Sequence, residues 1–384
     1  MAKYKLGEIC EIVSGSTPKT GIAEYWDGNL KWITPAEIDD ESYIITDSAR
    51  KLTELGVKKT GLSSFPSGTV ILSSRAPIGK VAIAGCEMYC NQGFKNLICS
   101  DRINNRYLYW FLKGNTAYLN SLGRGATFKE ISKKIVSDIE INVPEISQQL
   151  AAVDALERVS EIIRLRKNQL QKLDELVKAR FVELFGDVIR NSKSWEIRVL
   201  ADIASSRLGK MLDTKQQTGE CSYPYLANFN VQWFRFNTEN LNQMDFNEED
   251  RIEFELQNGD LLVCEGGEIG RCAVWHNEIQ PCFFQKALHR VRCNRQIVHP
   301  DYLGWWFKYN CDHDGFATIA GAKATIAHLP GVKLKQLRVA IPPLELQEQF
   351  AAFVEQTDKS KVAVQKALDE AQLLFDSLMQ KYFG

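Results

Sequence analysis

Short apolar runs bounded by Gly, Pro or Asn recur along most of the chain. Runs of about four to eight residues rich in Val, Ile and Leu are typical of β-strands. The aromatic segments 105–113 and 300–308 have apolar residues at helical spacing, which predicts short amphipathic helices. Both halves of the chain therefore predict mixed α and β structure. The clearest strand predictions are residues 68–73, 80–84, 261–264 and 272–275.

Residues 145–186 and 344–384 have a different pattern, which predicts two long helices. Each segment follows a proline and contains no Gly or Pro before its terminal Gly, and these are the usual boundaries of a helix. Apolar residues recur there with heptad spacing, interrupted by Arg166 and Arg180 in the first helix and by Thr357 and Lys361 in the second. The predicted seams are Leu156, Val159, Ile163, Leu170, Leu173, Val177 and Leu184 in the first, and Phe350, Val354, Val364, Leu368, Ala371, Phe375, Leu378 and Tyr382 in the second.

Seams with this spacing are buried by pairing one helix with another, and the simplest partner for each long helix is the other one. We therefore expect an antiparallel coiled coil. The alternative is that each helix packs separately on its own globular domain.

The chain also contains an internal repeat, since several motifs of the first half recur in the same order in the second half. One short match would be chance, but an ordered series indicates a duplication. The matched pairs include Leu6-Gly7-Glu8-Ile9 with Leu200-Ala201-Asp202-Ile203, Ile78-Gly79-Lys80 with Ile269-Gly270-Arg271, and Tyr107-Leu108-Tyr109-Trp110 with Tyr302-Leu303-Gly304-Trp305.

Pattern and repeat together predict an α+β protein with pseudo-twofold symmetry. We expect two similar mixed α/β domains, residues 1–144 and 187–343, separated by the long helices 145–186 and 344–384. A chain of 384 residues with 45% hydrophobic and 25% charged residues has enough apolar content for such cores. This composition excludes a wholly disordered or fibrous protein.

The chain opens without an apolar leader and contains no stretch long enough to cross a membrane, so we expect a soluble cytoplasmic protein. The ten Cys contain no C-x-x-C pair, and we expect them to be reduced and mostly buried. The net charge of −1 does not favour nucleic-acid binding, but a net charge averages over the faces of a molecule.

No catalytic set is apparent, and we expect no catalytic residue, metal site or cofactor in this chain. The phosphate-binding, dinucleotide-binding and amino-methyltransferase motifs are all missing. His313 between two Asp suggests a metal site, but an exposed polar turn explains it better. The set Asp174, Glu175 and Lys178 loosely resembles a nuclease motif, although an ion pair within the helix is the simpler explanation.

What remains in both halves is a set of loops with side chains that suit DNA recognition. Arg pairs with guanine, Asn and Gln pair with adenine, and Glu accepts from cytosine, whereas Lys more often contacts phosphate. Two similar modules with such loops indicate a reader of a DNA site in two parts. The candidates are Arg75, Lys80, Asn91, Gln92, Lys95, Arg124, Thr127 and Lys129 in the first half, and Glu265, Arg271, Gln285, Lys286, Lys323 and Thr325 in the second.

The whole chain resembles the specificity (S) subunits of type I restriction-modification systems. The resemblance rests on the repeated motifs above, on Phe-Gly at both helix ends, and on the glutamine-rich helix openings Glu145-Ile146-Ser147-Gln148-Gln149 and Glu345-Leu346-Gln347-Glu348-Gln349. It implies that two target recognition domains each read one half of a bipartite, asymmetric site in double-stranded DNA, while the helices act as a ruler.

The resemblance also implies two methylation (M) subunits as partners, with translocase/nuclease (R) subunits joining the assembled core. It implies no catalytic residues in the S subunit itself, and the lack of a long apolar stretch predicts that a membrane is not among the partners. One difference between the halves is that Glu265-Gly266-Gly267 replaces Ser74-Arg75-Ala76, so we expect two different half-sites.

Two other functions fit part of the pattern: a coiled-coil scaffold unrelated to DNA, and a fused methyltransferase–specificity protein. Alternatives also stay open for Arg75, which precedes Pro77 and Gly79 and is expected on a tight loop. It could read guanine, contact phosphate, or pair with a local acid such as Glu87.

Overall fold

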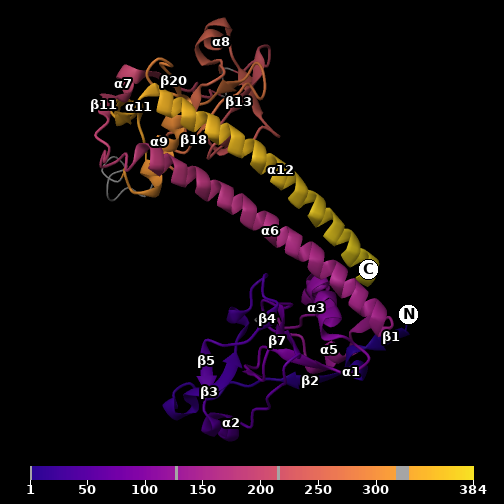
Figure 1. Cartoon of the computed structure of the whole chain (residues 1–384). Coiled ribbons are helices and arrows are strands. Elements are labelled where there is room, and N and C mark those ends of the chain that lie inside the picture. Colours follow the sequence, from indigo (N-terminus) through magenta and orange to yellow (C-terminus); the bar gives the residue numbers. More distant parts are fainter. Residues whose placement is uncertain (1, 126–128, 214–216, 317–327) are drawn as a thin grey trace. The chain divides into compact units, whose positions relative to one another are not determined.

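The computed structural model describes residues 2–125, 129–213, 217–316 and 328–384. The chain forms two compact units (Figure 1): Met1–Lys167 with Lys366–Gly384, and Asn168–Gln365. Each unit contains a globular domain and one part of each long helix.

A mixed sheet with the strand order β2-β9-β6-β7-β4 forms the centre of the first domain. Its neighbouring strands are antiparallel except for β4, which runs parallel to β7. A second sheet has the order β5-β3-β8, and β1 pairs with β10. The strands are β1 Ala2–Lys5, β2 Cys10–Ser14, β3 Trp26–Ile33, β4 Ile44–Ile45, β5 Arg50–Leu52, β6 Val70–Leu72, β7 Val81–Ala84, β8 Tyr89–Cys90, β9 Lys95–Cys99 and β10 Glu140–Val143.

The second domain repeats this arrangement. Its sheets have the orders β12-β20-β17-β18 and β16-β13-β19, and β11 pairs with β21. Each domain has a parallel strand pair at the equivalent position: β3 with β8 in the first domain, and β13 with β19 in the second. The small hairpin β14–β15 belongs to the second domain. The strands are β11 Glu196–Val199, β12 Ala204–Leu208, β13 Ser222–Leu226, β14 Val231–Gln232, β15 Arg235–Phe236, β16 Asn242–Asp245, β17 Leu261–Cys264, β18 Cys272–Val274, β19 Phe283–Phe284, β20 Leu288–Cys293 and β21 Arg338–Ile341.

Short helices connect these strands, and the predicted aromatic helices are confirmed as α3 Asn105–Gly114 and α9 Pro300–Asp312. Asn104 caps α3 by accepting from the N–H groups of Arg106 and Tyr107, which explains where this helix begins. The other short helices are α1 Leu6–Ile9, α2 Glu54–Thr60, α4 Thr116–Ser121, α5 Lys133–Asp138, α7 Leu200–Ile203, α8 Glu248–Phe254 and α11 Gly331–Lys335, with 3₁₀ turns η1 Ala23–Tyr25, η2 Pro35–Glu37 and η4 Asn228–Asn230.

The long helices are α6 Ile146–Phe185 and α12 Leu344–Phe383, each of 40 residues. Every predicted seam residue is buried or half-buried. The two polar interruptions of α12 lie in the same seam: Thr357 is buried, and Lys361 binds Asp174 of α6 at 2.7 Å. Asp174 therefore pairs across the two helices, and not with Lys178 within α6 as we expected.

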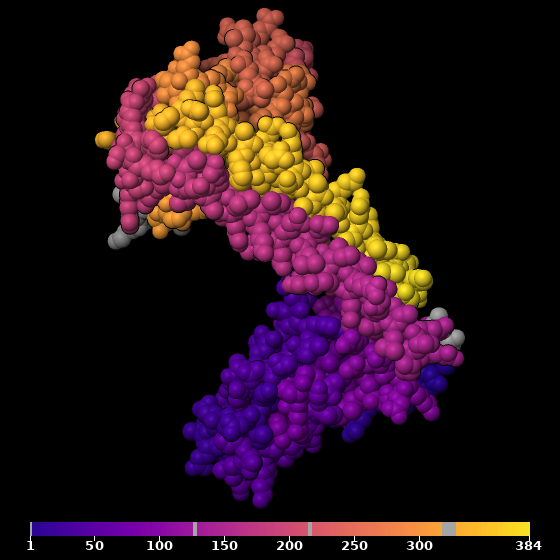
Figure 2. Space-filling model, viewed as in Figure 1, coloured from indigo at the N-terminus to yellow at the C-terminus, as the bar shows by residue number. Residues whose placement is uncertain are grey.

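Both long helices contribute to the core of each unit, and in each unit the opposite ends of the two helices pack together. In the first unit the start of α6 packs with the end of α12, through residues such as Leu156 and Phe375. In the second unit the end of α6 packs with the start of α12, through Phe185 and Phe350. Figure 2 shows these two helix segments side by side on the surface. The helices are therefore antiparallel, and packing of each helix on its own domain alone is not what the structure contains.

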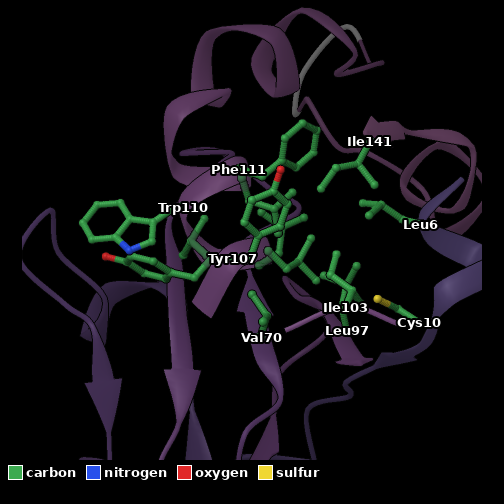
Figure 3. Close-up of a cluster of buried hydrophobic side chains, with 14 of the residues drawn as sticks. Leu6, Cys10, Val70, Leu97, Ile103, Tyr107, Trp110, Phe111 and Ile141 are labelled. Carbon is green, nitrogen blue, oxygen red and sulfur yellow. The ribbon is translucent and has the colours of Figure 1, made fainter. Parts of the chain in front are cut away.

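The core of the first domain lies between α3, the central sheet and the N-terminal residues. Figure 3 shows Tyr107 and Phe111 of α3 in one cluster with Val70 and Leu97 of the sheet. In the second domain the equivalent cluster joins Tyr302 of α9 to Leu261 and Val263 of β17. The predicted α+β architecture with an internal repeat is thus confirmed. None of the helices in the described residues is long and apolar enough to span a bilayer.

Candidate nucleic-acid interface

Four loops of the first domain are joined by backbone hydrogen bonds; we call residues 15–17, 35–37, 73–79 and 91–93 the first loop cluster. The N–H of Ser16 donates to the carbonyl of Cys90 at 3.0 Å, and the N–H of Ser74 donates to Gly93 at 2.7 Å. Asn91 donates to Ile33 at 3.1 Å, at the end of the strand that leads into 35–37. These bonds fix the loops relative to one another.

The second domain builds the same arrangement from residues 209–212, 228–230, 265–270 and 285–287, the second loop cluster. Here Lys210 donates to Phe284 at 3.2 Å, Glu265 to Ala287 at 2.9 Å, and Gln285 to Leu226 at 3.0 Å, all through the backbone. Each bond has its counterpart in the first cluster. The duplication therefore preserves the backbone framework, including the loops that hold most of the candidate residues.

Lys80 and Arg271 occupy equivalent positions and make equivalent contacts. Lys80 Nζ donates to the carbonyl of Pro35 at 3.0 Å, in η2, and Arg271 Nη2 donates to the carbonyl of Asn228 at 3.0 Å, in η4. Arg271 also pairs with Glu268 at 3.4 Å. In each domain this cation fastens a 3₁₀ turn to the neighbouring loop, so both side chains stabilise the framework.

Arg75 and Lys95 meet at one carboxylate, that of Glu130. Arg75 Nε donates to Oε2 at 2.8 Å, and Lys95 Nζ donates to Oε1 at 3.3 Å. The Lys95 side chain is only 9% exposed and also bonds Ser74, whereas that of Arg75 is 45% exposed. Partial burial alone would raise the pKa of Glu130, but its bonds to the two cations outweigh burial and hold the pKa below its usual range.

The other candidates differ in how they are presented. Asn91 Oδ1 accepts from the N–H of Gly93 at 2.9 Å, so this oxygen stabilises its own loop. Glu265 and Gln285 are half-buried. Thr127, Lys323 and Thr325 lie outside the described residues. Gln92, Arg124, Lys129 and Lys286 are exposed.

Comparison with known proteins gives the family. Residues 1–175 and 192–371 each match the model of the type I restriction modification DNA specificity domain. The chain belongs to this family. The resemblance inferred from the repeated motifs is thereby confirmed.

Individual relatives agree with this assignment. The chain is 36% identical over 223 residues to the type I restriction enzyme MjaIX specificity subunit of Methanocaldococcus jannaschii, a match that covers 53% of this chain and 52% of that protein. It thus spans about half the length of this relative. The S subunit from M. genitalium has the same fold, with a TM-score of 0.61 at 15% identity, over 100% of this chain and 96% of that one. A second solved chain comes from a study of complex assembly and conformational transition of the type I R-M system. Its TM-score is 0.63 at 17% sequence identity, and the match covers 100% of this chain and 97% of that one.

Sequence reasoning missed Glu130, which holds two of the candidate cations of this specificity domain. The repeat places Lys95 opposite Ser14 in one domain and His289 opposite Leu208 in the other. His289 is buried, and burial lowers its pKa, so the second domain has an imidazole whose charged form is disfavoured where the first has the lysine of an ion pair. The sequence feature that could have revealed this role is that an acidic residue, Glu130, directly follows the candidate Lys129.

The other chemistry considered from the sequence takes ordinary structural roles. His313 Nδ1 lies 2.9 Å from the carbonyl of Tyr309, and neighbouring Asp312 pairs with Lys308. No group of three metal-binding side chains occurs in the part of the chain that the structure describes. None of the ten Cys forms a disulfide; six of them are buried and four are half-buried.

Proposed function

We propose that this chain is the sequence-specific DNA-recognition subunit of a type I restriction-modification complex. In this proposal residues 1–144 and 187–343 each read one half of a bipartite, asymmetric site, and the helical segments 145–186 and 344–384 set the spacing. The chain docks two methylation subunits, and translocase/nuclease subunits join the assembled core. The chain itself contributes recognition and no catalytic group.

One observation carries this proposal: two loop clusters share a hydrogen-bonded backbone but carry different side chains. Ser74 and Glu265 make the same backbone bond, yet the next residue is Arg75 in one domain and Gly266 in the other. A constant framework with variable exposed side chains suits the reading of two unlike sequences, because base edges are distinguished by side-chain donors and acceptors.

The test is to sequence the DNA methylation of the host strain with this gene, without it, and with the gene restored. We expect one bipartite motif to be modified only when the gene is present. Persistence of every modified motif after deletion would contradict the proposal. Tight binding of S-adenosylmethionine by the purified chain would instead favour the fused methyltransferase.

A further inference from the structure

An aromatic side chain protrudes from the second loop cluster. Phe229 lies in η4 and is 59% exposed. Most exposed single apolar residues have no function, so its exposure alone means little. Its setting is more informative, because the turn that carries it is held firmly on several sides.

Hydrogen bonds fix η4 from both sides. Arg271 binds the carbonyl of Asn228, and the Asn228 amide donates to Gly266 at 3.2 Å. The buried Asn230 accepts from the N–H of Ala227 at 2.9 Å, and Gln232 donates to the carbonyl of Phe229 itself at 3.1 Å. The ring of Phe229 is therefore presented on a rigid turn next to the loop that replaces Arg75.

The first domain has the same turn without the ring. η2 is fastened by Lys80 as η4 is by Arg271, and its equivalent residue is the exposed Ala36. The turn therefore does not need a phenyl group in order to form. The aromatic side chain is a property of the second cluster alone.

The residues beside the two turns also differ, since a polar residue of the first cluster is replaced by an apolar one in the second. Thr17 of the first cluster donates a hydrogen bond to Gln92. The equivalent residue in the second cluster is Met211, which is 63% exposed and follows Lys210, whose carbonyl accepts from the N–H of Lys286. The first cluster thus presents polar groups and Arg75, whereas the second presents the apolar Phe229 and Met211 together with the exposed Lys286.

We propose that Phe229 is a specificity-determining residue that makes apolar contact with a base in the half-site read by the second domain. This inference rests on the proposed DNA-recognition function. Apolar side chains read DNA by contacting the thymine methyl group or by wedging into a base step, and a rigidly held ring serves either contact at low entropic cost.

The test uses the whole chain in its host, with the deletion strain complemented by single variants and its methylation sequenced. Phe229→Ala should lower modification at the original motif at least about tenfold, or make one position degenerate, within one half-site only. Phe229→Tyr keeps the ring and should keep the motif. Ile252→Ala is the matched control, because Ile252 is 87% exposed on α8 of the same domain but outside the cluster.

An unchanged motif with Phe229→Ala would overturn the inference, as would equal loss at both half-sites or the same loss with Ile252→Ala. Unaltered melting of the purified variant excludes misfolding as the cause. Failure of the proposed function gives a different result, because the motif would then survive deletion of the gene. Thymine-to-uracil substitution in the affected half-site distinguishes contact with a thymine methyl group from wedging into a base step. Because uracil lacks this methyl group, the substitution should reproduce the effect of Phe229→Ala only if the ring contacts the methyl group.

Discussion

At the scale of single residues, the guanidinium of Arg75 is held from one side. Glu130 accepts from Nε, whereas Nη1 and Nη2 make no hydrogen bond to any residue that the structure describes. A planar group anchored in this way is preorganised for a bidentate contact with guanine. The acid that pairs with Arg75 is therefore Glu130 and not Glu87. Glu87 instead accepts a hydrogen bond from Ser64.

Arg75→Ala should weaken recognition of one half-site by about 1–3 kcal/mol and leave the other unchanged. Binding of the assembled complex to DNA with a single altered half-site, measured across a salt series, provides the test. A phosphate contact would instead lower affinity for all sequences and make the salt slope shallower by about one. A purely structural role would leave DNA binding intact and cost at most about 1 kcal/mol of stability, since the pair is exposed.

Glu130→Gln should reduce discrimination between specific and non-specific DNA. The substitution removes the charge that orients Arg75, and it leaves Arg75 and Lys95 without their shared anion. Affinity for non-specific DNA should rise, because one negative charge near the phosphates is lost. The ratio of the two affinities is the readout, and Glu87→Gln is the control. An unchanged ratio would exclude a positioning role for Glu130.

Arg75 could be chosen from the sequence because it follows a strand-like run and precedes Pro77. The roles of Lys80 and Lys95 could not, since an exposed cation and one committed to a carbonyl or a buried carboxylate look alike in a sequence. The pairing of Arg75 with Glu130 joins residues 55 positions apart. It depends on how two loops meet, and no local pattern records that.

At the scale of elements, heptad spacing and Pro–Gly boundaries predicted the long helices because both signals are local. Strand pairing was not predictable in the same way, since β-sheet register depends on tertiary packing. The glutamines at the helix openings illustrate the difference. Gln149 and Gln347 are both fully buried, although the sequence offered them only as features of a family resemblance.

Gln149→Ala should destabilise the first unit locally. Its side chain accepts from the N–H of Asn104 at 2.8 Å and donates to the carbonyls of Arg102 at 3.0 Å and Pro144 at 2.8 Å. Each buried group left unpaired costs about 1–3 kcal/mol. Hydrogen exchange should therefore accelerate around residues 102–104, with little change in the second unit. Gln148→Ala removes an exposed neighbour and should have no effect, whereas Gln347→Ala should act on the second unit.

At the scale of the whole molecule, charge limits what this chain does alone. The net charge is −1, and Lys80, Lys95 and Arg271 are engaged within the protein. DNA affinity comes largely from neutralising phosphates and releasing counterions. The isolated chain should therefore bind DNA weakly and gain affinity with methylation subunits, as titration of labelled DNA would measure. Nanomolar, salt-sensitive and sequence-specific binding by the lone chain would contradict this.

The paired helices lead to a prediction about spacing. Asp174 contacts Lys361, so positions after Lys172 in α6 and after Ala363 in α12 lie near each other in the seam. Seven residues inserted at both positions keep the heptad phase and lengthen each helix by about 10 Å. The modified motif should then keep both half-sites, and the gap between them should widen by about three base pairs at roughly 3.4 Å each. Insertion into α6 alone, which mismatches the seam, should abolish modification. If the paired insertion changed the half-site bases while the gap stayed constant, the helices would not set the spacing.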